Sequence, residues 1–215
     1  MNDPLQAYRT RKAIDQALAR ILNGEYESAW TELQSQVTAG VDGPEIQHGL
    51  GVAGMHLGRF EEALVHFETA LALAPDNAVG WNDYGEACRA LSRSQEAQDA
   101  YRKALALDPD FPEACNNLAV ALSEQGEWAE AEALFHEALA MNAGYATARV
   151  NLGVLLAMLG RLPEALDCFE TVILADPTDA LALRYFEQIL SQHPELAQGS
   201  VARLRGVLEG NREGG

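Results

Sequence analysis

The apolar residues between Trp81 and Pro109 fall into two groups with helical spacing. In the second group, Ala97, Tyr101 and Ala104 lie four and then three residues apart, which places them on one side of an α-helix. Pro109 follows this group closely, and proline cannot continue a helix because it lacks the backbone N–H. The pattern predicts two short amphipathic helices that end at a proline.

The same pattern returns along the chain at a fixed interval of 34 residues. An alanine recurs, and from the second copy onward an aromatic residue stands four positions after it; these residues are Ala29, Ala63, Ala97, Ala131 and Ala165, with Phe67, Tyr101, Phe135 and Phe169. A period of this length with these landmarks resembles the tetratricopeptide repeat (TPR) family, whose unit is a helix-turn-helix. The resemblance covers about residues 10–193. It implies an all-α fold, a right-handed TPR superhelix (α-α solenoid) of about five repeats plus C-terminal capping helices.

The resemblance also implies boundaries along the chain. Terminal repeats of a solenoid are atypical because one face meets water instead of a neighbour, so both ends are expected to be caps. We expect an N-terminal helix and a degenerate first repeat at 1–43, four clear repeats at 44–77, 78–111, 112–145 and 146–179, capping helices at 180–209, and a flexible tail at 210–215.

The chain is strongly acidic. It has 32 Asp and Glu against 15 Lys and Arg, for a formal net charge of -17. Such a charge repels nucleic acid and anionic membrane surfaces and favours basic proteins or peptides. The alternative is that acidity only keeps a long helical surface in solution. No apolar run is long enough to span a membrane, and the N-terminus lacks the apolar core of a signal peptide, so we expect a cytoplasmic protein.

The sequence offers no set of catalytic, cofactor-binding or metal-binding residues, so we do not expect an enzyme. The segment 49–54 has the glycine spacing of a dinucleotide-binding motif, but the repeat places it inside one helix that another helix precedes. Gly51 matches the small residue of the family. Gly49 and Gly54 are then additional glycines that destabilise their helix by roughly 1 kcal/mol each, so the helix at 44–57 should be the least rigid inner one. His48 and His56 are interpreted as ordinary surface histidines.

The family resemblance implies where a ligand would bind. When each repeat is numbered so that Trp81 stands at position four, the first helices of TPR proteins commonly present positions two, five, six, nine, twelve and thirteen to a ligand in the concave groove. In this chain the expected peptide-binding residues are Glu45, His48, Val52, Met55, His56, Asn82, Asp83, Glu86, Arg89, Glu113, Asn116, Asn117, Val120, Glu124, Thr147, Val150, Asn151, Val154 and Met158.

Asparagine at position six resembles the asparagine ladder in the TPR region of O-linked N-acetylglucosamine transferases. Asn117 and Asn151 occupy that position, and Asp83 replaces asparagine in the preceding repeat. An amide offers donors and an acceptor together, so stacked asparagines can hold a peptide backbone. The alternative is that these side chains bond only to the neighbouring helix. Glu45 and Glu113 stand where chaperone-binding TPR domains have lysine, which argues against binding of a C-terminal carboxylate.

These observations predict a non-enzymatic scaffold that binds an extended peptide or protein segment in its groove. The groove combines acidic residues with the apolar Val120, Val150, Val154 and Met158, so a partner with basic and apolar residues would match it. Two alternatives stay open. The chain could be a regulatory or targeting subunit of a larger complex, of the glycosyltransferase or secretion type, or it could self-assemble. We expect a monomer or a weak homo-oligomer.

Overall fold

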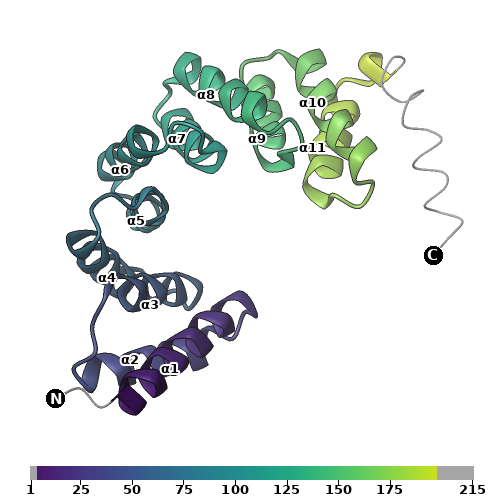
Figure 1. Cartoon of the computed structure of the whole chain (residues 1–215). Coiled ribbons are helices and arrows are strands. Elements are labelled where there is room, and N and C mark those ends of the chain that lie inside the picture. Colours follow the sequence, from purple (N-terminus) through teal and green to yellow (C-terminus); the bar gives the residue numbers. More distant parts are fainter. Residues whose placement is uncertain (1–3, 198–215) are drawn as a thin grey trace, which may run out of the picture. The chain divides into compact units, whose positions relative to one another are not determined.

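The computed structural model describes residues 4–197, and the side chains of residues 8–197. Within this range the backbone forms eleven α-helices, one 3-10 helix and no strand (Figure 1). The elements are α1 Pro4–Leu22, α2 Tyr26–Thr38, α3 Pro44–His56, α4 Phe60–Leu73, α5 Ala78–Ala90, α6 Ser94–Leu107, α7 Pro112–Glu124, α8 Trp128–Met141, α9 Ala146–Met158, α10 Leu162–Ala175, α11 Ala180–Gln192 and the 3-10 helix η1 Pro194–Leu196. Residues 198–209 of the capping helices expected at 180–209, and the whole tail expected at 210–215, lie outside the described residues.

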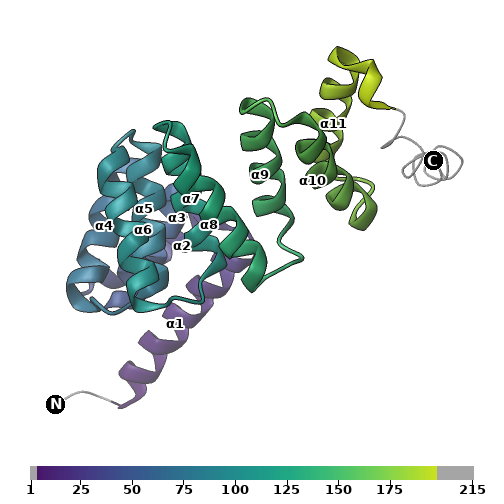
Figure 2. The same ribbon diagram turned by 90° about the horizontal axis from the view of Figure 1, so that it is seen from above.

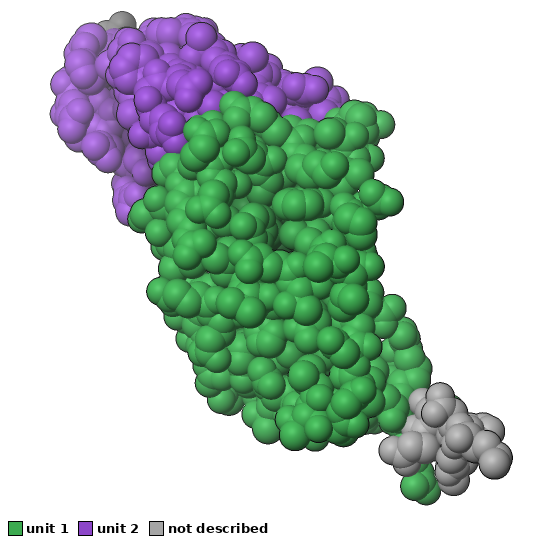
Figure 3. Space-filling view, turned by 90° about the vertical axis from the view of Figure 1, so that its left-hand side faces the viewer, with its two compact units in different colours: residues 1–110 green, residues 111–215 purple. Residues whose placement is uncertain are grey.

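The helices belong to two compact units, residues 1–110 and residues 111–215 (Figure 3). Within each unit every helix packs against its neighbours in sequence, as Figure 2 shows for α9, α10 and α11. The odd-numbered helices also touch one another, α1 with α3 and α3 with α5 in unit 1, and α7 with α9 and α9 with α11 in unit 2. No contact of similar extent joins two even-numbered helices among the described residues. The prediction of an all-α TPR solenoid is therefore confirmed, with the odd-numbered helices forming one continuous face of each unit.

The residues that recur every 34 positions form the core of both units. The recurring alanines have no exposed surface, and the recurring aromatic residues are at most 1% exposed. In three repeats the aromatic ring of the second helix lies against a glycine at position eight of the first helix, and a Cβ added to Gly51 would stand 2.5 Å from the Phe67 ring. Because no side chain separates them, the two helices of the repeat approach closely, and the ring fills the space beside the contact.

The turn between the two helices of a repeat uses a residue in the left-handed conformation. Gly58 has φ 72°, and Arg59 N–H donates to the carbonyl oxygen of Gly54 at 2.8 Å, which closes the end of α3. Ser92 takes the same place after α5 with φ 59°, and it is the one described residue other than glycine with a positive φ. The third repeat therefore makes the same turn with a less suitable residue.

The interpretation of Gly49 and Gly54 as additional glycines is wrong. A Cβ on Gly49 would stand 2.9 Å from the side chains of Leu18 and Leu33, and a Cβ on Gly54 would stand 2.9 Å from Trp30. Both positions are buried where α3 meets the first repeat. The two glycines allow the close packing of α3 against α1 and α2, because an added Cβ would force the neighbouring side chains to shift.

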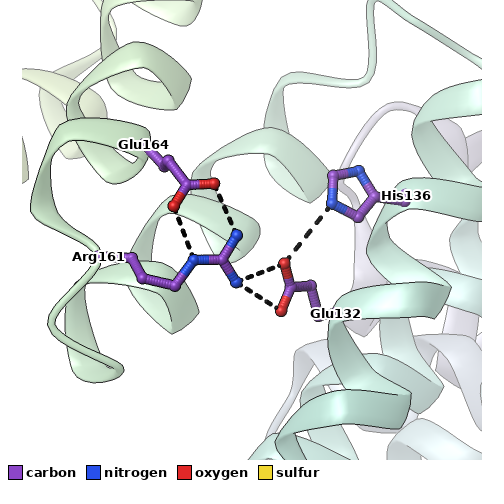
Figure 4. A network of polar contacts seen from close by, with 4 residues as sticks. All are labelled: Glu132, His136, Arg161 and Glu164. Atoms are coloured by element: carbon purple, nitrogen blue, oxygen red, sulfur yellow. Dashed lines mark hydrogen bonds and ion pairs between the residues drawn. The ribbon is translucent and has the colours of Figure 1, made fainter.

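Arg161 joins two second helices of unit 2 (Figure 4). Its Nη1 donates to both carboxylate oxygens of Glu132 on α8 at 2.7 and 2.8 Å. Its Nε and Nη2 donate to the two oxygens of Glu164 on α10 at 2.7 and 2.6 Å. His136 lies 3.8 Å from the same Glu132 carboxylate. The guanidinium group lowers the pKa of Glu164 through these hydrogen bonds, and the paired carboxylates in turn raise the pKa of Arg161.

Candidate functional site

The odd-numbered helices carry all the residues that the sequence predicts for a ligand site. They are placed on α3, α5, α7 and α9. In each unit some of them meet around a pocket, and the second-helix aromatic residue of the repeat also lines it.

The pocket of unit 2 lies between α7 and α9 and has a volume of about 200 Å³. Five of its lining residues were predicted from the sequence, namely Val120, Glu124, Asn151, Val154 and Met158. The others are Ser123, Phe135 and Leu155. Met158 is 65% exposed, whereas Phe135 is 1% exposed, so the pocket extends from the surface of the unit to the aromatic core. Its walls are mainly apolar, with the Asn151 amide and the Glu124 carboxylate as polar groups.

The pocket of unit 1 lies between α3 and α5 and has a volume of about 190 Å³. Its lining residues are Val52, Met55, His56, Phe67, Asp83 and Glu86. All of these except the core residue Phe67 were predicted from the sequence. The two pockets occupy equivalent places two repeats apart, since Val52 corresponds to Val120, Phe67 to Phe135, Asp83 to Asn151 and Glu86 to Val154.

Position five of one repeat bonds to position six of the next in both units. In unit 1, His48 Nε2–H donates to Asp83 Oδ2 at 2.7 Å. In unit 2, Asn151 Nδ2–H donates to Asn116 Oδ1 at 2.9 Å. The structure therefore contains the inter-helix bond that was the alternative to a ligand-binding ladder. An asparagine makes up to four hydrogen bonds, so this contact orients Asn151 without using its full capacity.

Three predicted residues are buried too deeply to face a ligand. Asn82, Asn116 and Val150 are 6%, 4% and 2% exposed. All three stand at position five of their repeats. The Asn82 amide donates to Asp83 Oδ1 at 3.2 Å and the Asn116 amide to Asn117 Oδ1 at 3.2 Å. Asn82 and Asn116 therefore help to orient the side chains at position six of their own repeats.

The remaining predicted residues lie outside these two pockets. Glu45 and His48 line a larger, more open pocket of about 640 Å³ in unit 1, together with Leu18, Pro44 and residues 74–77. Arg89, Glu113 and Thr147 are exposed, and Asn117 is half-buried. His56 is not an isolated surface histidine, because its ring stacks on Tyr26 with the centroids 4.0 Å apart.

No reactive group is prominent in the described part of the chain. All three cysteines are buried, and burial raises the pKa of the Cys115 thiol to about 11. Residues 8–197 contain no group of three His, Cys, Asp or Glu side chains that could hold a metal ion. Among the described helices, none combines the length and apolar content needed to cross a bilayer.

Comparison with known families identifies the fold. The model of the middle TPR-like domain of cilia and flagella-associated protein 70 matches residues 20–167. The chain belongs to this TPR-like family. TPR repeats are generally non-catalytic, and a TPR-like fold serves in general as a scaffold for protein partners. No curated protein matches the chain.

Solved TPR structures share this fold. The thermophilic TPR protein TTC0263 of Thermus thermophilus is 24% identical with a TM-score of 0.72, over 84% of this chain and 99% of the other. MamA from Desulfovibrio magneticus RS-1 is 16% identical with a TM-score of 0.68, over 80% and 97%. YrrB, described as a TPR protein with an unusual peptide-binding site, is 23% identical with a TM-score of 0.64, over 81% and 90%.

Proposed function

We propose that this TPR-like protein binds an extended peptide or protein segment on the face formed by its odd-numbered helices. The observation that carries the proposal is the pocket of unit 2, which opens on that face and reaches the buried Phe135 ring. An apolar side chain of the partner enters this pocket. Burying such a side chain contributes about 1.5–3 kcal/mol, which corresponds to at least a tenfold gain in affinity.

One polar group of the pocket, the Asn151 amide, suits a peptide backbone. Asn116 fixes the Asn151 amide through one hydrogen bond, so the carbonyl oxygen and the second N–H of Asn151 remain for a peptide N–H and C=O. An apolar pocket beside an oriented amide is a frequent arrangement in ligand sites, where a few polar groups set the orientation. The peptide-binding site in the description of YrrB supports the same role for a chain of this fold.

Selection from a random-peptide phage library on the whole chain, followed by fluorescence anisotropy with single synthetic peptides, tests the proposal. We expect Val154→Glu to weaken the binding of the selected peptides at least tenfold, because it places a charge in the apolar pocket. The matched control is Leu174→Glu, which adds the same charge on α10 of unit 2 at a side chain that is 48% exposed. Selection of no peptides, or equal binding by the two variants, would exclude this site.

A further inference from the structure

The two equivalent pockets have nearly the same volume but different chemistry. At position nine, Val52, Val120 and Val154 are valine, whereas Glu86 is the exception. At position six, Asn117 and Asn151 are asparagine and Gly49 is glycine, whereas the third repeat has Asp83. Both exceptions line the pocket of unit 1, so the same architecture there carries two carboxylates in place of an amide and an apolar group.

Asp83 is held in place by neighbours that leave it able to accept further hydrogen bonds. Its Oδ2 accepts from His48 Nε2–H at 2.7 Å, and its Oδ1 accepts from Asn82 Nδ2–H at 3.2 Å. A carboxylate has about four acceptor positions, so roughly two remain for a ligand. The Asp83 side chain is 20% exposed, and it lines the pocket. The carboxylate is therefore oriented in advance toward whatever enters.

Three of the other lining residues suit the hydrocarbon part of a long basic side chain, and the remaining one is His56. Val52, Met55 and Phe67 supply apolar walls, and no lysine or arginine lines the pocket. Lysine and arginine bury their methylene groups on such surfaces while the charged end reaches a polar partner. A cation beside an aromatic ring is attracted by the face of that ring as well.

Other side chains fit this pocket less well. A leucine or methionine would remove water from the Asp83 carboxylate without replacing its hydrogen bonds, which is unfavourable. An acidic side chain would be repelled by Asp83 and Glu86. At the positions of Asp83 and Glu86 the pocket of unit 2 has Asn151 and Val154; Glu124 is its one lining carboxylate, and its mainly apolar walls favour apolar side chains.

We propose that the pocket of unit 1 is a specificity site for a lysine or arginine side chain of the partner protein. This assignment rests on the proposed function, since it takes the odd-numbered helices as the peptide-binding face. It adds a basic residue to the features that a partner peptide needs. It also assigns the preference for a basic over an apolar or acidic side chain to Asp83 and Glu86.

The test gives the pocket of unit 1 the chemistry of the pocket of unit 2, in the whole chain. Asp83→Asn with Glu86→Val gives unit 1 the residues that unit 2 has at the same positions. The matched control, Glu61→Gln with Glu68→Gln, also removes two negative charges from unit 1, but at exposed residues of α4 that line neither pocket. Asp83→Asn alone is a milder second variant, and helical circular dichroism during heating shows that each variant is folded.

We expect lysine and arginine to be enriched among peptides selected by the wild type, and not among those selected by the double variant. For a selected peptide, replacing its lysine with methionine should weaken binding to the wild type about tenfold, as loss of a charge-assisted hydrogen bond does. The same replacement should leave binding to the double variant unchanged. Added salt should weaken wild-type binding more than binding to the double variant.

Two results would overturn the assignment while leaving the proposed function intact. One is a set of peptides that depends on Val154 but shows no enrichment in basic residues. The other is an equal loss from the lysine-to-methionine replacement in the wild type and in the double variant, because the lysine would then bind elsewhere. If no peptide depends on Val154, the proposed function itself fails.

Discussion

Ser92 offers a direct test of how the third repeat makes its turn. Its φ of 59° lies in the left-handed region, where the other repeats use glycine, such as Gly58 at 72°. The hydrogen bonds around it match those of the glycine turns, since Arg93 N–H donates to the carbonyl oxygen of Cys88 at 2.8 Å. Replacement of Ser92 by glycine should therefore keep the turn and remove its strain.

The magnitude follows from two opposing terms. The left-handed conformation costs a residue with a Cβ about 1–2 kcal/mol. Replacing serine with glycine removes that cost but also stabilises the unfolded chain by about 0.4–1 kcal/mol, because glycine has more conformational freedom. Ser92→Gly should then raise the free energy of unfolding by somewhat less than about 1 kcal/mol. For a chain of this size that is a rise in melting temperature of roughly 2–4 °C at most.

Urea denaturation of the whole chain, followed by helical circular dichroism, measures the effect. The reciprocal variant Gly58→Ser should lower the free energy of unfolding by a similar amount, because a Cβ there meets no atom within 4 Å and only the backbone conformation is affected. If Ser92→Gly is neutral or destabilising while Gly58→Ser destabilises, the serine turn is not strained and the reasoning fails.

Three further predictions concern packing and charge. Gly54→Val should destabilise the protein by about 1–3 kcal/mol in urea denaturation, because its side chain would collide with α2, whereas Gly43→Ala should not, since it has open space. Burial lowers the pKa of His66 below its usual 6.5, so the unfolded chain takes up the proton first and stability should fall as pH drops through about 6.5; His66→Gln should show a smaller loss over that range. Arg161→Met should raise the pKa of Glu164 toward its usual value, which an NMR titration measures. It should also lower the melting temperature, by less at high salt than at low salt, because salt screens the ion pairs that the wild type has. An unchanged Glu164 titration would contradict the bonding in Figure 4.

The face that carries the candidate site was predictable, but the role of each residue on it was not. The repeat spacing placed Asp83, Val154 and Met158 beside a pocket, because positions six, nine and thirteen of a first helix point the same way. Position five behaves differently. Asn116 and Val150 are buried, and their burial depends on how closely two repeats pack. A helical pattern within one repeat contains no information about that distance.

The sequence by itself determined the repeat, its helices and its turns. These depend on local preferences and on a period of 34 residues, and Ala97 and Tyr101 occupy the core as that period requires. Only the tertiary structure decided that Gly49 and Gly54 are packing residues and that His48 and Asn116 bond across repeats. Those contacts join residues on different helices, and their distances are set by how the helices pack against one another.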